Sequence, residues 1–358
     1  MKPQDTLFDF ILKEWLLIAS AAGLVVTSVY LNRLPSFSIA ECQVLFILAV
    51  LFVAVKGLEQ SGLILRLSQG VEKGKFIPLK LIVVTFFLSM LVTNDVALIV
   101  IVPLTLVLNT NRKDILVILE ALAANAGSAL TPFGNPQNLF IYWFYDVRAE
   151  AFIISIAPFS LVFLVLLVLA SLLISTSNNK VLKPETAKIK YQVFIYGALL
   201  LTVILAVLHI LPVQVAFIVI IYAIIFDRNS LRIDYALLLT FACFFGLAEN
   251  MQSIFAANIE HSGHIFIFSA LLSQIISNVP ATLLLAKFTT QWKALLWGTN
   301  VGGFGSLVGS LANLIAYKLY ITHEDTNNAV SFTTKFLLLG YGAFLIGIIL
   351  YFGIERIH

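Results

Sequence analysis

Charged residues are scarce in this sequence, and their scarcity excludes a water-soluble fold. Of the 358 residues, 11% are charged and 60% are hydrophobic, whereas an ordinary soluble domain carries about 25% charged residues. The apolar residues form blocks of roughly 15 to 25 residues between short polar stretches, the spacing set by a hydrocarbon layer about 30 Å thick. The sequence therefore predicts a polytopic, all-α integral membrane protein.

Other signals are missing as well. The net charge is only +3 and the Lys and Arg residues lie between apolar blocks, so nucleic-acid binding has no support. Cys42 and Cys243 stand alone in apolar stretches, which argues against disulfides or a metal cage and predicts packing roles. The strand alternation of an outer-membrane barrel is missing, and residues 1–14 lack the cleavage pattern of a signal peptide.

Most of the apolar blocks have the length of one membrane crossing. We predict nine crossings, near 15–32, 39–58, 115–145, 151–175, 191–210, 212–227, 234–250, 293–320 and 332–354. Two further blocks, 77–109 and 264–290, are too long for one helix and too short for two crossings. Each has a polar tripeptide at its centre, so we predict two opposed re-entrant hairpins whose tips lie near the bilayer midplane.

Three segments of the first half recur in the second half in the same order. The sequence NAGSALTPFGNPQNLFIYWFY at 125–145 aligns without a gap with NVGGFGSLVGSLANLIAYKLY at 300–320. Identical pairs in this register include Asn125/Asn300, Gly127/Gly302, Gly134/Gly309 and Asn138/Asn313. The hairpin centres pair Thr93 with Ser277 and Asn94 with Asn278, and GLEQSG at 57–62 resembles GLAENM at 246–251. This order predicts two inverted repeats, 1–175 and 191–358.

The stretch between the repeats sets the expected orientation. Residues 176–190 carry four Lys against one Glu, which predicts a cytoplasmic linker by the positive-inside rule. Counting crossings from it places the N-terminus in the cytoplasm and the C-terminus outside the plasma (inner) membrane. The first repeat is one helix shorter than the second, and the sequence does not explain why.

Two crossings contain residues that interrupt a helix. TPFGNP at 131–136 cannot be continuous helix, because proline lacks the amide donor, and four glycines loosen 302–309. Unwound backbone at membrane depth must face protein or a wet cavity. Its carbonyls suit Na⁺, and its helix N-termini suit an anion.

We therefore predict one substrate and ion site built from the two hairpin tips and the two breaks. Its residues are Thr93, Asn94, Asp95, Asn125, Thr131, Gly134, Asn135, Asn138, Ser277, Asn278, Asn300, Gly302, Ser306, Gly309, Ser310 and Asn313. A coupling Na⁺ would lie near Asn94, Asp95 and Asn278. No other cofactor is expected, and the partners are a small inorganic or organic ion and the lipid bilayer.

Asp95 is the one acid that we place at the centre of an apolar block. A carboxylate there costs roughly 2.5–3.5 kcal/mol on insertion scales and usually has a function. Burial disfavours its charged form, whereas a bound Na⁺ or helix amides favour it, so Asp95 is the predicted coupling group. The alternative is that it only caps the amides of the second hairpin arm. Glu59 and Glu249 fall near helix ends, where a solvated role is as plausible as an ion site.

The hairpin sequences TNDVALIVIVPLTL at 93–106 and SNVPATLLLAKF at 277–288 resemble those of the ion-transporter superfamily, as do both breaks. That superfamily includes arsenite efflux permeases, D-type sodium/proton antiporters, and divalent-anion/sodium symporters that carry citrate or other carboxylates. The resemblance implies a scaffold domain, a mobile transport domain and often a homodimer. In the dicarboxylate symporters both tips read Ser-Asn-Thr and contact sodium and substrate; Asp95 and Val279 depart from that pattern.

The resulting hypothesis is a secondary active transporter that moves a small anion with H⁺ or Na⁺. A sodium/proton antiporter and an arsenite efflux permease stay open as alternatives within the same class. An ion channel shares a polar midplane, but opposed hairpins favour alternating access over a continuous pore. An intramembrane enzyme is not expected, because the spans contain no HExxH motif, no Ser/His pair and no second buried Asp to form a catalytic pair with Asp95.

The expected orientation can be tested by labelling single cysteines from outside. The variants Ser177→Cys in the linker and Ile357→Cys at the C-terminus, in a background without Cys42 and Cys243, should differ in their reaction with an impermeant thiol reagent. We expect the Ile357→Cys variant alone to react in intact cells. The reverse pattern would invert the topology.

Overall fold

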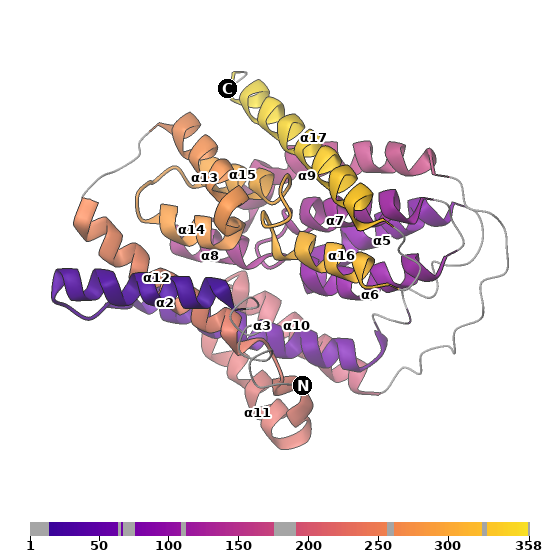
Figure 1. Cartoon of the computed structure of the whole chain (residues 1–358). Helices are drawn as coiled ribbons and strands as arrows, with labels where there is room; N and C mark the ends of the chain where they lie inside the picture. The colour runs from indigo at the N-terminus through magenta and orange to yellow at the C-terminus, as the bar shows by residue number, and fades with distance from the viewer. Residues whose placement is uncertain are drawn as a thin grey trace, which may run out of the picture.

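The computed structural model describes residues 14–63, 66, 76–108, 112–174, 191–255, 261–323 and 328–356. Within these ranges the chain is helical apart from turns and connecting segments, and no β-strand occurs there, which confirms the all-α prediction. The predicted linker at 176–190 and both chain ends lie outside these ranges. The helices fall into two groups that differ in what they contain (Figure 1).

The flanking group lies in the lower part of Figure 1 and contains no hairpin. It comprises α2 (Trp15–Leu31), α3 (Ile39–Gln60), α10 (Gln192–Val207), α11 (Phe217–Phe226) and α12 (Tyr235–Phe255), with short 3₁₀ turns at Val213–Ala216 and Arg228–Leu231. Helix α12 packs along α2, and α3 packs against α10, α11 and α12. The group therefore unites the start of the first predicted repeat with the start of the second.

The hairpin group contains both predicted hairpins and both predicted helix breaks. Its first part is α5 (Ile77–Val92), α6 (Asn94–Val107), α7 (Lys113–Ser128), α8 (Pro136–Phe144) and α9 (Ala149–Leu172). Its second part is α13 (Ser262–Ile276), α14 (Asn278–Ala286), α15 (Trp292–Gly302), α16 (Leu311–Ile321) and α17 (Ala329–Glu355). The two parts interlock, since α16 packs on α6 and α7, and α14 packs on α8.

Each block predicted as a hairpin forms two helices joined by a single residue. Thr93 joins α5 to α6 with φ 83° and ψ 153°, and Ser277 joins α13 to α14 with φ 75° and ψ 155°. This backbone region is adopted almost only by glycine, and a side chain there costs about 1–3 kcal/mol. The same strained conformation at equivalent positions indicates that both tips are held by their surroundings. That the hairpins end at the bilayer midplane stays a prediction.

Both predicted broken crossings contain a gap in the helix. Helix α7 ends at Ser128 and α8 starts at Pro136, where a proline in the first turn loses no hydrogen bond. In the second, α15 ends at Gly302 and α16 starts at Leu311. Gly305 within this gap has a φ of 82°, a conformation that glycine adopts without strain.

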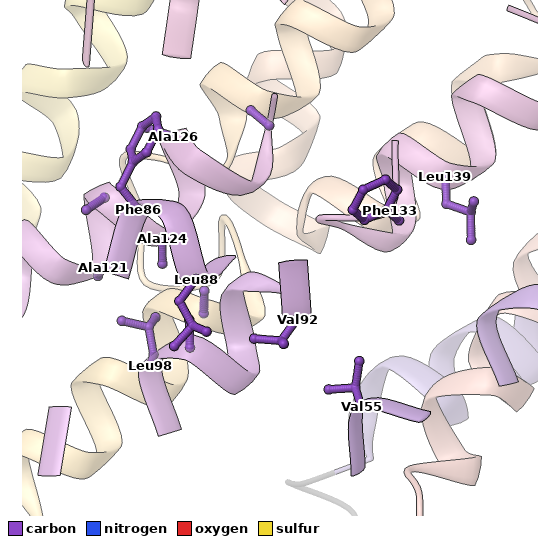
Figure 2. Packing of buried hydrophobic residues seen from close by; sticks show 14 of the residues in the cluster. Val55, Phe86, Leu88, Val92, Leu98, Ala121, Ala124, Ala126, Phe133 and Leu139 are labelled. Atoms are coloured by element: carbon purple, nitrogen blue, oxygen red, sulfur yellow. The ribbon is translucent and has the colours of Figure 1, made fainter. Parts of the chain in front are cut away.

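Small residues allow the hairpins to pack closely on the broken helices. A Cβ placed on Gly127 of α7 would lie 2.1 Å from the carbonyl oxygen of Phe86 in α5, and one on Gly302 of α15 would lie 2.5 Å from the Cβ of Ser273 in α13. Alanines of α7 lie along the same contact (Figure 2). Close backbone approach of this kind drives helix association in lipid, where the hydrophobic effect between helices is absent.

The outward faces of the helices are apolar. Exposed residues on α9, α11 and α17 include Ile154, Leu169, Ile225, Leu338 and Ile349, a surface that a soluble protein would not tolerate. Four stretches are long and apolar enough to span a membrane: Ile39–Gln60, Ala149–Leu172, Arg228–Phe255 and Ala329–Glu355. The number of nine crossings stays a prediction.

The packing role predicted for the two cysteines is wrong for one of them. Cys42 is exposed at the first turn of α3, and Cys243 is half-buried in α12. The apolar run around Cys42 faces the core only on one side of the helix, so hydrophobic neighbours in the sequence did not fix its orientation.

The glycine contact leads to a stability prediction. Gly127→Ala should lower the thermal unfolding temperature of the purified protein, because the methyl group overlaps the Phe86 carbonyl and overpacking costs about 1–3 kcal/mol. Gly197→Ala in α10 is the matched control, since nothing lies within 4 Å of its Cβ position. It should be neutral or stabilising by up to about 1 kcal/mol. Equal unfolding temperatures for the two variants would contradict the close packing.

Candidate functional site

The two hairpin tips and the first helix break enclose a small cavity between the helix groups. It has a volume of about 80 Å³. Its lining residues from the hairpin group are Asn94, Asp95, Asn135, Pro136, Gln137, Ser277, Asn278, Val279, Pro280 and Leu311, and those from the flanking group are Leu16, Leu237, Thr240 and Phe241. Asn94 and Asn278, 184 positions apart, therefore line one cavity. We call it the inner cavity.

Three lining side chains carry buried polar atoms that no hydrogen bond satisfies. They are Asp95 Oδ1, Asn135 Oδ1 and Gln137 Nε2. Leaving such an atom unpaired costs about 1–3 kcal/mol, so native proteins rarely bury them without a partner. Two acceptors and one donor at one cavity are the arrangement expected of a ligand site. Asp95 Oδ1 has no amide partner, which argues against a role as a mere helix cap.

Four helices begin at this cavity. The first residues of α6, α8, α14 and α16 all contribute to its lining, and no side chain caps α6, α8 or α14. Helix N-termini carry partial positive charge and unpaired amide donors, so they attract anions. Asp95 lies in the first turn of α6 and partly offsets this field.

A network of four asparagines lies behind the cavity and connects the two sequence repeats. Asn125 donates to Asn313 Oδ1 over 2.8 Å and accepts a hydrogen bond from Asn94 over 3.0 Å. Asn300 donates to Asn138 Oδ1 over 2.9 Å. Because Asn125 pairs with Asn300 in the repeat and Asn138 with Asn313, these two cross-connections are equivalent.

The same network satisfies the unwound backbone at both breaks. Asn138 Nδ2 donates to the carbonyls of Ser128, Ala129 and Thr131, and Asn313 Nδ2 donates to those of Gly303 and Ser306. The hydroxyls act alike: Thr131 donates to the Met90 carbonyl, and Ser306 donates to the Gln274 carbonyl. Each break is thereby tied to the arm of its own hairpin, as buried carbonyls at a helix end require.

A second, wider cavity reaches Asp95 from one side. Its volume is about 230 Å³. It is lined by Phe52, Val55, Lys56, Glu59, Thr93, Asp95, Val96, Ile99, Arg232, Ile233, Asp234, Leu237, Leu311 and Ile315. We call this second cavity the vestibule. Asp95, Leu237 and Leu311 line both cavities, so they separate the vestibule from the inner cavity. Glu59 pairs with Lys56 within α3 over 3.0 Å, whereas Glu249 lies at the far end of α12.

The sixteen predicted residues thus divide into two sets. Those that line a cavity are Thr93, Asn94, Asp95, Asn135, Ser277 and Asn278. The others hold the breaks in place: Asn125, Asn138, Asn300, Asn313, Thr131 and Ser306 by hydrogen bonds, Ser310 as the cap of α16, and Gly134, Gly302 and Gly309 by close packing.

Sequence reasoning missed Gln137 and Thr240 in the lining. Gln137 follows directly on the break, and a polar residue next to the Asn-Pro pair was the available signal. Thr240 stands in an otherwise apolar run, and its hydroxyl donates to the Ala236 carbonyl. Neither residue has a polar counterpart in the other repeat, so the repeat comparison passed over both.

The expectation that Asp95 is the one acid inside an apolar block is wrong. Glu120 lies in the middle of α7 with no exposed surface. The Thr105 hydroxyl donates to its Oε1, and its Oε2 has no hydrogen-bond partner. It lines neither cavity. Helix α7 is buried on nearly all sides, so its sequence shows no polar face that would separate Glu120 from a surface acid.

Comparison with known proteins agrees with this architecture. Residues 8–297 match the model of the citrate transporter family. The chain belongs to the citrate transporter family. Similar proteins include an uncharacterized transporter of Methanocaldococcus jannaschii, 37% identical over 87% of this chain and 88% of its own length, and the inner membrane protein YbiR of Escherichia coli K12, 33% identical over 76% and 78%.

A third relative, the silicon efflux transporter LSI3 of Oryza sativa subsp. japonica, is 38% identical over 95 residues, a quarter of this chain and 19% of its own length. The family and these relatives establish a multi-pass membrane transporter for an ion or another small molecule. Family membership also supports a non-enzymatic role. The resemblance to the ion-transporter superfamily, seen in the hairpins and breaks, is confirmed.

The asparagine network of this transporter can be tested by truncation. Asn125→Ala should lower the unfolding temperature, because the Asn94 amide and Asn313 Oδ1 lose their shared partner at about 1–3 kcal/mol for each unsatisfied group. It should also weaken any ligand-induced stabilisation.

The matched control is Asn250→Ala in the flanking group, whose amide donates to Thr27 and Ser28. It should lower stability while leaving the ligand-induced shift unchanged. Loss of the ligand response in both variants would mean that the network has no special connection with the site.

Proposed function

We propose that this transporter moves a small anion across the membrane, coupled to H⁺ or Na⁺ at Asp95, with the inner cavity as the site. The observation that carries the proposal is the convergence of three unpartnered buried polar atoms on one cavity at four helix N-termini. A ligand that satisfies Gln137 Nε2 needs an acceptor, and one that satisfies Asp95 and Asn135 needs a cation or a donor.

The charge of the site explains why coupling is needed. Among the described residues no Lys, Arg or His lines the inner cavity. An ionised Asp95 would therefore repel an anion that the helix N-termini attract. A proton or Na⁺ on Asp95 removes that repulsion, so cation and anion would bind together. No cluster of three or more His, Cys, Asp or Glu occurs in the described part of the chain, which favours one carboxylate with neutral oxygens, as suits Na⁺.

The shape of the site supports alternating access. The inner cavity, about 80 Å³, is far smaller than the roughly 300–1,000 Å³ of a typical ligand pocket. The vestibule beside it is larger and ends at Asp95. An organic anion would enter through the vestibule and gain room as the hairpin group shifts against the flanking group. The family description names citrate, which supports a carboxylate as the substrate class.

A second function is favoured by the missing basic residue. With one acid and no fixed cation, the inner cavity also suits exchange of Na⁺ for H⁺ at Asp95 without any anion. A thermal-shift screen of the purified protein separates the two, because a ligand that binds only the folded state raises its stability. The ligands are Na⁺, Li⁺, citrate, other carboxylates, sulfate, arsenite and silicate.

Anion transport predicts a stabilising carboxylate or oxyanion whose effect grows with Na⁺ or with acidity. Stabilisation by Na⁺ alone, opposed by acid and unaffected by every anion, would support exchange instead.

The coupling role of Asp95 predicts a specific defect. Asp95→Asn keeps the size of the side chain but cannot bind a proton or pair with Na⁺, so transport in proteoliposomes should lose its dependence on pH or Na⁺. Two controls keep an acid-to-amide change away from the cavity. Asp114→Asn removes a pair with Lys335, and Glu120→Gln alters a buried acid that lines neither cavity. Both variants should retain the dependence. If Asp95→Asn retains it as well, neutral oxygens must hold the coupling ion.

A further inference from the structure

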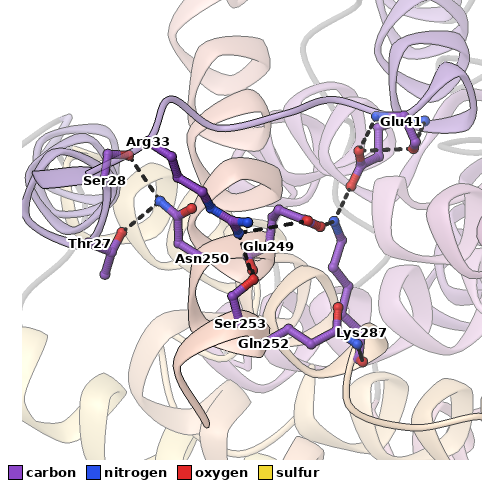
Figure 3. A network of polar contacts seen from close by, with 10 residues as sticks. Thr27, Ser28, Arg33, Glu41, Glu249, Asn250, Gln252, Ser253 and Lys287 are labelled. Carbon is purple, nitrogen blue, oxygen red and sulfur yellow. Dashed lines mark hydrogen bonds and ion pairs between the residues drawn. The ribbon is translucent and has the colours of Figure 1, made fainter. Parts of the chain in front are cut away.

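The contact between the two helix groups is strongly polar at one place. Lys287 directly follows α14, the second arm of the hairpin formed by α13 and α14. Its Nζ lies 2.6 Å from Glu249 Oε2 in α12 and 2.8 Å from Glu41 Oε1 in α3. Figure 3 shows Lys287 between the two carboxylates. Gln252 of α12 also donates to the Lys287 carbonyl over 2.7 Å. One end of the hairpin is thereby bound to two flanking helices.

Two members of the cluster are buried, and the third is partly exposed. Lys287 and Glu41 are 9% and 1% exposed, and Glu249 is 28% exposed. Glu41 is fixed by its own helix start, where its second oxygen accepts hydrogen bonds from the backbone and side chain of Ser38. Arg33, 3.9 Å from Glu249, adds an outer cation. Separating such a pair leaves a buried charge without a partner unless water enters.

The cluster and the vestibule lie at opposite ends of the same helices. Glu41 is in the first turn of α3, whereas Glu59 of the vestibule is in its last turn, about 27 Å away at ~1.5 Å per residue. Likewise Asp234 precedes α12, and Glu249 lies toward its other end. The boundary between the groups is thus open at the vestibule and closed at Lys287, with the inner cavity between them.

The pairing at the open end differs in kind. Lys56 and Glu59, three positions apart, pair within α3 and do not connect the groups. Lys287, by contrast, belongs to the hairpin group and both its partners belong to the flanking group. Any shift that opens the inner cavity on that side must separate Lys287 from Glu41 and Glu249.

We propose that Lys287, with Glu41 and Glu249, forms the gate that closes the transporter on the side opposite the vestibule. The inference rests on the proposed alternating access and assigns a positioning role to Lys287, which does not touch the inner cavity. With the gate closed, the site communicates with the vestibule alone. When the gate opens, water replaces the ion pairs, and the strength of the cluster sets the balance between the two states.

The test measures access to the inner cavity in membrane vesicles without any substrate. The reporter is Val279→Cys, a lining residue at the tip of hairpin two, in a Cys42→Ser/Cys243→Ser background. An impermeant thiol reagent is applied to right-side-out and to inside-out vesicles. With Lys287 present, reaction should be fast from the vestibule side and slow from the other.

Lys287→Gln should raise the slow rate by roughly tenfold or more, because an open state that is ~0.1–10% populated becomes a major one. Lys287→Arg should restore the slow rate. Lys335→Gln is the matched control, because Lys335 pairs with Asp114 inside the hairpin group and lines neither cavity, and it should leave the slow rate unchanged. A folded Lys287→Gln variant that reacts no faster than the parent overturns the gate, since the cluster is then a static brace.

Should Lys287→Gln fail to fold, Glu41→Gln/Lys287→Gln decides. It leaves no buried charge without a partner, because Glu249 is partly exposed and keeps Arg33 as its neighbour, and it should react fast from the same side. If that variant reacts slowly or also fails to fold, the proposal is overturned, because a protein whose gate opens during transport must stay folded when these ion pairs separate. The assay needs no substrate or ion gradient. Failure of anion transport therefore would not alter its outcome, and a static cluster would leave the proposed site intact.

Discussion

The structure depends on satisfying unwound backbone in a place where no lipid can hydrogen-bond to it. Asn138 and Asn313 do this for the two breaks by donating to the carbonyls that α7 and α15 leave unpaired. Their own oxygens accept from Asn300 and Asn125 of the opposite repeat. The residue that satisfies each break is therefore itself held by an asparagine of the opposite repeat.

This mutual support determines what can serve as the binding site. Polar atoms that the network uses are no longer available, and those that it leaves over face the inner cavity. At the start of α8, for example, Asn138 donates to backbone carbonyls and accepts from Asn300, whereas the Oδ1 of Asn135 and the Nε2 of Gln137 have no partner. The strained backbone at Thr93 and Ser277 serves the same end, because it starts α6 and α14 at the cavity.

Much of this could be predicted from the sequence because local chemistry enforces it. Clustered prolines and glycines, as at 131–136 and 302–309, interrupt a helix, although the single Pro103 and Pro158 lie within α6 and α9. Polar residues within apolar blocks mark hairpin tips, so the breaks and Asn94 and Asn278 could be predicted. The rotation of each helix about its own axis could not be predicted. Periodicity is lost in a helix such as α7, which is buried all round, so Glu120 passed unnoticed. Nor does sequence show that Lys287 and Glu41 meet, since that pair depends on how two helix groups dock.

Residues that are identical in the two repeats and residues that differ between them have different roles in the structure. Residues identical in both repeats, such as Asn125/Asn300 and Gly127/Gly302, build the frame. Residues that line the inner cavity match only in part, since Asn94 and Asn278 are identical, whereas Asp95 is opposite Val279 and Gln137 is opposite Ala312 in the repeat alignment. If the two repeats form equivalent halves, as the sequence predicts, the frame can adopt two conformations of similar energy, one for each side of the membrane. In the proposed mechanism the unmatched residues then supply what two equivalent halves cannot, a single titratable group at the site and an ion cluster that favours one conformation over the other.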